Sequence, residues 1–282
     1  MNINETNFSR KISIIQGRLS PRPFPKLQVF PAKTWELEFN LAGQLGFYSI
    51  EWIFCLAEYN PIWSAAGRKK IRELVSASGV QIKSICADYF LENPFFRGPD
   101  DIRKKNILIF MDLIRHSAEI GVQSILLPVL ETSEIRNTEE HKLLLDAVGQ
   151  SLPLLEEYGI KVGFETELPA QDYLKLVSAL NSPRVGAYYD FGNCAAKGYD
   201  TTENINILKD KLINVHLKDR PVSGQSVYLG EGAANFKKAL PKLIQQGFDG
   251  LFVLQPYFGE DYLSDALRNK KYINDILEKG ST

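Results

Sequence analysis

The sequence is poor in the residues that mark zinc-binding, secreted or membrane-spanning proteins. Its 282 residues contain three cysteines, Cys55, Cys86 and Cys194, which are far apart and form no CxxC pair, so a cysteine zinc site is not expected. No segment approaches the ~20 apolar residues of a membrane span. The start MNINETNFSRK is too polar for a signal peptide. We therefore predict a cytoplasmic protein with reduced thiols that binds no membrane.

An excess of basic residues is also missing. Lysine and arginine number 33 against 34 acidic residues, and the formal net charge is −1. Because nucleic acid backbones are bound by basic surfaces, nucleic acid is not the expected partner. Hydrophobic residues make up 44% of the chain, which is enough for a substantial core.

A helix-glycine-strand junction recurs along the chain. In LVSASG-VQIKSI and LEEYG-IKVGFE, a helix-like stretch ends at glycine, and an apolar or β-branched run follows. Glycine suits the left-handed backbone that closes a helix because it has no Cβ. Repeated αβ units are indicated by such junctions at Gly46, Gly79, Gly121, Gly159 and Gly247.

The remaining segments complete eight strand-helix units. Strands are predicted near 12–17, 48–54, 82–87, 123–130, 160–166, 185–190, 212–217 and 251–256, and helices near 34–45, 64–78, 100–120, 138–158, 170–181, 202–210, 234–246 and 260–279. Eight units in 282 residues fit a single (β/α)8 TIM barrel domain over residues 1–282. The alternative, an open doubly wound sheet, predicts a glycine-rich phosphate turn after the first strand, but QGRLSPRPFP has one glycine.

Polar residues stand at the ends of four consecutive predicted strands. In a barrel, the carboxyl ends of the strands build the active site, and alternate side chains face the interior. This alternation turns four residues inward on strands five to eight: Glu165, Asp190, His216 and Gln255. Two carboxylates, an imidazole and an amide oxygen suit a divalent cation such as Mn²⁺, Mg²⁺ or Co²⁺, with Zn²⁺ as a further candidate. Ion pairs with Lys218 or Arg220 are the alternative way to neutralise the two acids.

Several motifs give the chain a resemblance to a known family. The FE pair at Phe164–Glu165, the YYDFGN turn around Asp190, VHLKD at Val215–Asp219, GEG at 230–232 and QGRLSP at 16–21 resemble the xylose isomerase-like (β/α)8 superfamily. That superfamily includes sugar-phosphate isomerases and epimerases, ketose 3-epimerases, inosose dehydratases and the endonuclease IV group. The resemblance implies metal ligands at Glu165, Asp190 and His216 and a small-molecule carbohydrate substrate. It is compatible with a homodimer.

Two positions depart from the family pattern. The ligand on the last strand is usually glutamate and is Gln255 here, and a histidine that often stands three residues after the aspartate is Asn193 here. Family epimerases use the glutamates of strands five and eight to remove a proton and to return it on the opposite face. Glutamine ligates through oxygen but cannot act as a general base. Endonuclease IV-type activity needs a histidine-rich cluster, whereas His116 and His141 fall within predicted helices.

The leading hypothesis is a metal-dependent sugar isomerase or epimerase. Glu165 would remove a proton next to a carbonyl, the cation would stabilise the enediolate, and Gln255 would ligate the cation or position substrate. Lys218, Glu167 or water would return the proton. Two alternatives stay open: a lyase that dehydrates a keto-polyol with one base, and a non-catalytic sugar-binding barrel that has lost its metal.

Further polar residues near strand ends are candidates for binding substrate. Arg18 would suit an anionic sugar such as a phosphate ester. The full set is Arg18, Glu51, Asp88, Glu131, Glu167 and Arg220. For Glu51 and Glu131 a structural ion pair is the alternative, and for Arg220 it is a solvated loop position.

Overall fold

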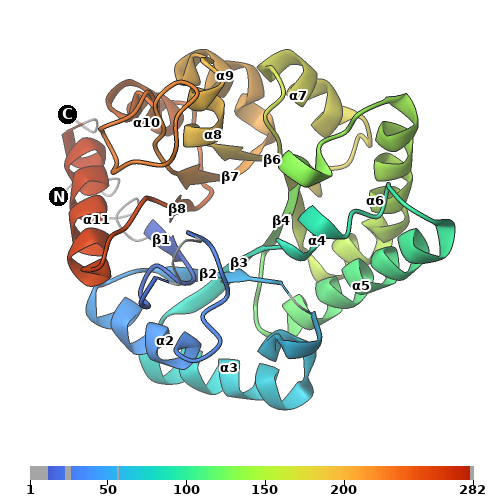
Figure 1. Ribbon diagram of the computed structural model, residues 1–282, viewed down its shortest axis with the longest axis horizontal. Helices are drawn as coiled ribbons and strands as arrows, with labels where there is room; N and C mark the ends of the chain where they lie inside the picture. The colour runs from blue at the N-terminus through green and yellow to red at the C-terminus, as the bar shows by residue number, and fades with distance from the viewer. Residues whose placement is uncertain (1–11, 23–26, 56, 280–282) are drawn as a thin grey trace.

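The protein is a closed barrel of eight parallel strands surrounded by helices (Figure 1). The computed structural model describes residues 12–22, 27–55 and 57–279, and the polar amino-terminal start falls outside these ranges. Strand β1 pairs with both β2 and β8, which closes the sheet. The predicted (β/α)8 barrel is therefore confirmed. The open doubly wound sheet is wrong, because it would leave two unpaired edges.

Each predicted strand and helix segment corresponds to an element of the structure. The strands are β1 (Ile12–Ile15), β2 (Ser49–Ile53), β3 (Gln81–Cys86), β4 (Ser124–Pro128), β5 (Lys161–Glu165), β6 (Val185–Asp190), β7 (Leu212–Leu217) and β8 (Phe252–Leu254). The outer helices are α2 (Trp35–Gln44), α3 (Ala65–Ser78), α5 (Asp100–Glu119), α6 (Thr138–Tyr158), α7 (Ala170–Ser178), α9 (Thr201–Leu208), α10 (Phe236–Gln245) and α11 (Tyr262–Lys279).

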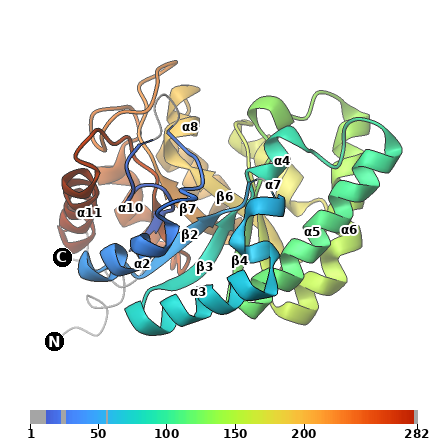
Figure 2. The ribbon, with the colours of Figure 1, turned by 60° about the horizontal axis from the view of Figure 1, so that its bottom comes forward.

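Short helices that the sequence did not predict lie in the connections. They are α4 (Tyr89–Glu92), α8 (Phe191–Ala196) and the 3₁₀ helices η2 (Ala57–Tyr59), η3 (Pro61–Trp63), η4 (Glu131–Ser133) and η5 (Lys209–Lys211). Elements of three to six residues are too short for a helical periodicity to appear in the sequence. Because α4 follows β3 and α8 follows β6, both lie at the carboxyl end of the barrel, the upper side in Figure 2.

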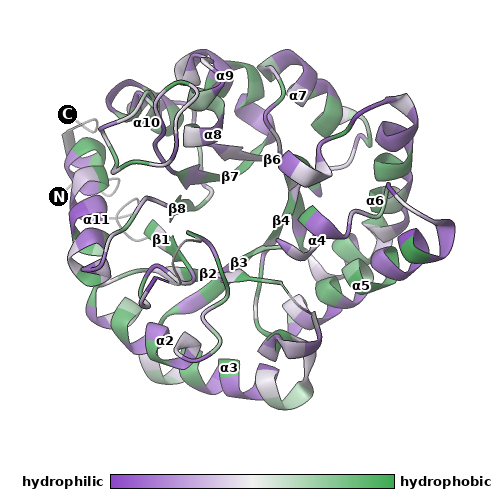
Figure 3. Ribbon diagram, in the orientation of Figure 1, coloured by the Kyte–Doolittle hydropathy of each residue, from purple (hydrophilic) through white to green (hydrophobic). Residues whose placement is uncertain are grey.

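The helix ends follow the predicted signals. The backbone of all five junction glycines is left-handed, with φ between 67° at Gly46 and 83° at Gly121. At the start of α3, the Ser64 hydroxyl accepts a hydrogen bond from the Gly67 amide at 3.0 Å. In Figure 3 the outer helices carry both hydrophobic and hydrophilic residues, as expected for helices with one face against the strands.

Histidines outside the strands lie where the sequence predicted. His116 is in α5, where its ring packs edge-on against Trp63 at a centroid distance of 5.0 Å, and His141 is in α6. In the described ranges, no helix has the length and apolar character needed to cross a membrane.

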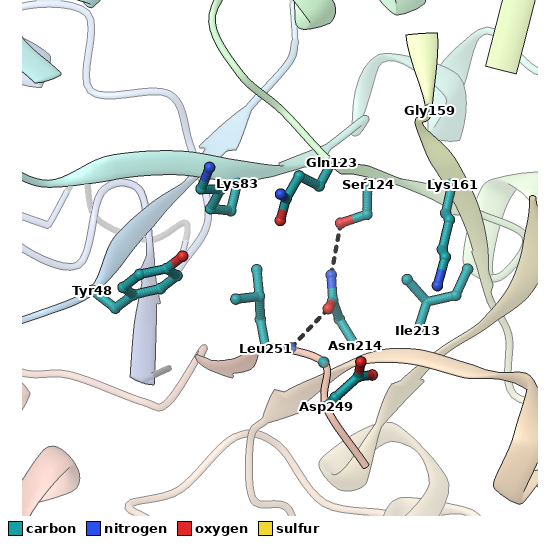
Figure 4. A pocket seen from close by; sticks show the side chains of 11 residues that line it. Tyr48, Lys83, Gln123, Ser124, Gly159, Lys161, Ile213, Asn214, Asp249 and Leu251 are labelled. Atoms are coloured by element: carbon teal, nitrogen blue, oxygen red, sulfur yellow. Dashed lines mark hydrogen bonds between the residues drawn. The ribbon is translucent and has the colours of Figure 1, made fainter. Parts of the chain in front are cut away.

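The amino-terminal end of the barrel is closed by a polar floor (Figure 4). Asn214 of β7 donates a hydrogen bond to the Ser124 hydroxyl at 2.7 Å, and its oxygen accepts one from the Leu251 amide at 2.8 Å. Below this floor is a cavity of about 290 Å³, with Lys83 and Lys161 in its wall. The cavity lies at the end of the strands opposite to the carboxyl-end site, so it is separate from the chemistry predicted there.

Candidate metal centre

Three of the predicted ligands converge inside the carboxyl end of the barrel. Glu165 ends β5, Asp190 ends β6, and His216 stands next to last in β7, where it pairs with Asp190. One ligand atom from each lies within 4.8 Å of the other two, and all three residues are buried. His216 Nδ1 is 3.7 Å from Glu165 Oε1 and 3.8 Å from Asp190 Oδ2. Among the described residues, this is the one cluster of three such ligand atoms.

Unpartnered polar atoms show that this cluster fits a cation. Within the described part of the chain, Asp190 Oδ2, His216 Nδ1 and Gln255 Oε1 are buried without a hydrogen-bond partner. Distances of 3.7–3.8 Å between the triad atoms are too long for hydrogen bonds. Buried polar atoms rarely stay unpaired. Because a carboxylate oxygen and an imidazole nitrogen both bind Mn²⁺, Mg²⁺, Co²⁺ or Zn²⁺, one divalent cation would satisfy Asp190 Oδ2 and His216 Nδ1 together. Gln255, which follows the neighbouring strand β8, stays a predicted further ligand.

His216 is oriented from behind by a buried carboxylate. Its Nε2 is 2.6 Å from Glu51 Oε2, and the Tyr188 hydroxyl donates to the other oxygen of Glu51. A donor at Nε2 leaves the Nδ1 lone pair free to face Glu165 and Asp190, the arrangement usual for metal-binding histidines. Burial lowers the pKa of His216, but the carboxylates of Glu51, Asp190 and Glu165 together outweigh it and raise the pKa well above its ordinary value, so a bound cation would take the place of a proton on Nδ1. Glu51 thus supports a ligand from a position with no solvent exposure.

Glycine at position 163 makes room for the Tyr188 side chain. A Cβ at Gly163 would lie 2.9 Å from Tyr188 Cβ, closer than such carbon atoms approach. Tyr188 therefore packs directly over the glycine, with its ring centroid 4.8 Å from that of His216. Gly163 stands two residues before Glu165, on the same face of β5.

The pKa values of the Glu165 and Asp190 carboxyl groups are shifted in opposite directions. The pKa of Glu165 is raised to about 7, mainly by burial, with a smaller contribution from the charge of Asp190 and an opposing effect of His216. Burial also favours the neutral form of Asp190, but Lys218 and His216 outweigh it and hold the pKa at about 2. Two carboxylates in one buried site thus conflict electrostatically, and a divalent cation would stabilise both in the charged form.

Asn193 connects the two carboxylates to the loop after β7. Its backbone amide donates to Asp190 Oδ1 at 2.8 Å, its side-chain Nδ2 donates to Glu165 Oε1 at 3.2 Å, and its Oδ1 accepts from Arg220 Nη1 at 3.0 Å. The first bond is the N-terminal cap of α8. Asparagine at the position of a common family histidine therefore holds the candidate base, and Arg220 holds the asparagine.

Lys218 lies one layer above the triad. Its Nζ is 3.6 Å from Asp190 Oδ2, beyond hydrogen-bond distance, and about a fifth of its side chain is exposed. A Cβ at residue 192 would lie 2.8 Å from Lys218 Cγ, so Gly192 allows this packing. Lys218 lowers the charge conflict without supplying the hydrogen bond that Asp190 Oδ2 lacks.

The other predicted substrate-binding residues divide into two groups. Arg18 is buried and donates to the Pro256 carbonyl at 3.0 Å and the Leu27 carbonyl at 2.6 Å, so these two donors are used inside the protein. Asp88 accepts hydrogen bonds on both oxygens, and Glu51 is buried behind His216. On the rim, Glu131 and Glu167 line a pocket of about 50 Å³, where Glu167 pairs with Lys197 at 2.8 Å.

Asp219 explains why VHLKD and GEG occur together. Its buried carboxylate accepts backbone hydrogen bonds from Gly230 and Gly232, at 2.8 and 3.0 Å, and from Ala234 at 3.0 Å. A Cβ at residue 232 would lie 2.2 Å from Asp219 Oδ1, so the second glycine of GEG allows this approach. The carboxylate holds the loop that follows β7.

Removing this carboxylate is expected to destabilise the fold. Asp219→Ala leaves several backbone amides without an acceptor, and we expect the free energy of unfolding to fall by about 3 kcal/mol. Urea denaturation followed by circular dichroism measures it. Asp210→Ala, at an exposed position, is the matched control and should change stability by less than about 0.5 kcal/mol. Equal stability of the two variants would show that the amides find other partners.

Comparison with known proteins agrees with the motifs. The family described as "xylose isomerase-like TIM barrel" matches residues 39–273. The chain is 25% identical over 266 residues to a putative L-ribulose-5-phosphate 3-epimerase, SgbU, from Haemophilus influenzae, covering 87% of this chain and 92% of that protein. It is 22% identical over 259 residues to the L-ribulose-5-phosphate 3-epimerase UlaE from Escherichia coli K12, covering 87% and 90%.

Solved structures share the barrel. One is the IOLI protein with a bound zinc atom, at a TM-score of 0.73 and 19% identity, covering 95% of this chain and 98% of the other. Another is a xylose isomerase-like TIM barrel protein from Mycobacterium smegmatis in complex with magnesium, at a TM-score of 0.72 and 17% identity, covering 95% and 97%. With the family match spanning most of the sequence, this chain belongs to the xylose isomerase-like TIM barrel family.

Proposed function

We propose that the protein is a metal-dependent sugar or sugar-phosphate isomerase or epimerase that removes a proton next to a carbonyl. The observation that carries the proposal is the pair of buried atoms without hydrogen-bond partners, Asp190 Oδ2 and His216 Nδ1, beside Glu165. Family membership supports a carbohydrate substrate, and the similar proteins named L-ribulose-5-phosphate 3-epimerases suggest ketose phosphates as the first compounds to test.

The contacts of each site residue suggest its role in the proposed reaction. Asp190 and His216, with Glu165 and Gln255, would hold the cation, which supplies Lewis-acid polarisation of adjacent sugar oxygens. Glu165 is the base that takes the proton from carbon, leaving an enediolate, and Asn193 holds one of its oxygens in place. The Gln255 amide is neither a general acid nor a general base at physiological pH, so Lys218, Glu167 or water would return the proton.

A lyase is the second candidate, and Gln255 is the observation that favours it. A two-base epimerisation needs an acid on the opposite face of the substrate, and an amide on the last strand cannot serve. Dehydration of a keto-polyol needs one base next to the carbonyl and a departing hydroxyl. Glu165 with a cation satisfies that requirement.

Metal analysis and isotope exchange together test the proposal. Protein purified without chelator is expected to carry about one equivalent of Mn, Mg, Co or Zn by elemental analysis. With L-ribulose 5-phosphate in heavy water, NMR is expected to show deuterium entering the carbon next to the carbonyl while the carbon skeleton keeps its oxygen. Loss of water from a keto-polyol would identify the lyase. Metal-free protein that binds sugar without exchange would identify a non-catalytic barrel and overturn the proposal.

A further inference from the structure

The amide of Gln255 is held in one orientation. Gln255 directly follows β8, and its backbone amide donates to the Leu217 carbonyl at 3.1 Å, so it continues the register beside β7. Its side-chain Nε2 donates to Gln28 Oε1 at 2.6 Å. Its Oε1 is buried and has no partner among residues 12–22, 27–55 and 57–279. A glutamine amide has a donor end and an acceptor end, so the contact at one end decides what the other presents.

Asp88 determines that orientation through a second glutamine. Gln28 Nε2 donates to Asp88 Oδ2 at 2.8 Å, and the other oxygen of Asp88 accepts from the Cys86 thiol at 3.1 Å. An ionised carboxylate only accepts hydrogen bonds, so Gln28 turns its NH₂ toward Asp88 and its oxygen toward Gln255. Gln255 must then turn its own NH₂ toward Gln28, which leaves its oxygen buried without a partner.

Arg18 fixes the backbone on both sides of this contact. Its Nη1 donates to the carbonyl of Leu27, the residue before Gln28, and its Nε donates to the carbonyl of Pro256, the residue after Gln255. The guanidinium also lies 4.9 Å from the ring centre of Phe258. The buried Arg18 guanidinium thus joins the loop after β1 to the end of β8, where Gln28 contacts Gln255.

We infer that Asp88 and Gln28 are positioning residues that make Gln255 present its carbonyl oxygen as a neutral fourth ligand to the cation. The inference rests on the proposed function for the presence of a cation, and it goes beyond that proposal by assigning the residues that orient the ligand. It also gives the buried carboxylate of Asp88 a role other than contact with substrate.

Cation affinity tests the inference without a substrate. Apo protein is titrated with Co²⁺ by calorimetry, and the visible spectrum of bound Co²⁺ reports the ligand set. Asp88→Asn lets the Gln28 amide reverse and turn the NH₂ of Gln255 toward the cation, so we expect about 10–100-fold weaker binding and an altered spectrum. Gln28→Ala and Gln255→Ala should show losses of the same size. Gln123→Ala, at the amino-terminal cavity, is the control and should bind as the wild type does.

A double variant supplies the rescue. In Asp88→Asn with Gln28→Glu, the new amide at 88 donates to the new carboxylate at 28, which still accepts from Gln255, so wild-type affinity and spectrum should return. Circular dichroism of each variant checks folding. If Asp88→Asn and Gln28→Ala bind Co²⁺ like the wild type while Gln255→Ala is weakened, the positioning role is refuted. Unchanged binding by Gln255→Ala would refute the ligand itself. Wild-type protein that binds no cation overturns the proposed function first, and this inference with it.

Discussion

Replacing Glu165 by glutamine is expected to lower turnover of the sugar substrate by about 10²–10⁴-fold, the usual contribution of a positioned general base. The glutamine oxygen can still accept the hydrogen bond from Asn193, so the geometry of the site should remain. What disappears is the group that takes a proton from carbon. The measurement is kcat/KM for conversion, together with the rate at which solvent deuterium enters the substrate in heavy water.

Glu167→Gln is the comparison variant for this change, because Glu167 is a candidate for returning the proton and deuterium exchange requires only the removal of that proton. Glu167 stands two residues further along the chain but pairs with Lys197 on the rim, and the same chemical substitution there should leave deuterium exchange largely intact. A Glu165→Gln variant with full exchange activity would show that another residue is the base. If Glu167→Gln instead loses exchange, the rim carboxylate takes that role.

Removing the charge behind His216 is expected to weaken cation binding by about 10–100-fold. In Glu51→Gln the amide oxygen can still accept from His216 Nε2, but the imidazole loses the carboxylate that makes it a stronger ligand. Calorimetric titration of apo protein with Co²⁺ measures the change, and thermal unfolding checks that the barrel stays intact.

Tyr188→Phe provides the comparison for Glu51→Gln. It removes the hydroxyl that donates to Glu51 and leaves the contact between Glu51 and His216 in place. We expect its loss of cation affinity to be smaller than that of Glu51→Gln. Equal affinities in wild type and Glu51→Gln would mean that the carboxylate does not tune the imidazole.

The sequence predicted the barrel because its signals are local. Glycines such as Gly79 and Gly159 end a helix by a left-handed turn, and the next strand begins within a few residues. Such junctions mark five of the strands, and the segments between them complete the count of eight. The inward alternation of side chains then places Glu165, Asp190 and His216 together, as the structure confirms.

The supporting contacts depend on pairs of residues that are distant in sequence. Glu51 and His216 are 165 positions apart, and Gln28 and Gln255 are 227 apart. Nothing in either neighbourhood marks the partner, because closure of the barrel alone brings β2 opposite β7 and the first loop against β8. The same limit applies to Arg18, which was predicted to bind an anionic sugar but donates hydrogen bonds to two backbone carbonyls. Its position at the mouth follows from the strand order, but its two carbonyl partners do not.

The packing of Tyr188 over Gly163 bears on how such an enzyme would change its substrate during evolution. A single methyl group at position 163 would displace the tyrosine ring and, through Glu51, tilt the imidazole. Substitutions in the inner wall of the barrel, formed here by Gly163, Tyr188 and Glu51, are therefore expected to be poorly tolerated. The rim around Glu131 and Glu167 is connected to the site less directly, because Glu167 lies 3.9 Å from Arg220, which reaches Glu165 only through Asn193. Divergence toward new sugars is accordingly expected to accumulate on the rim, while the wall is inherited unchanged.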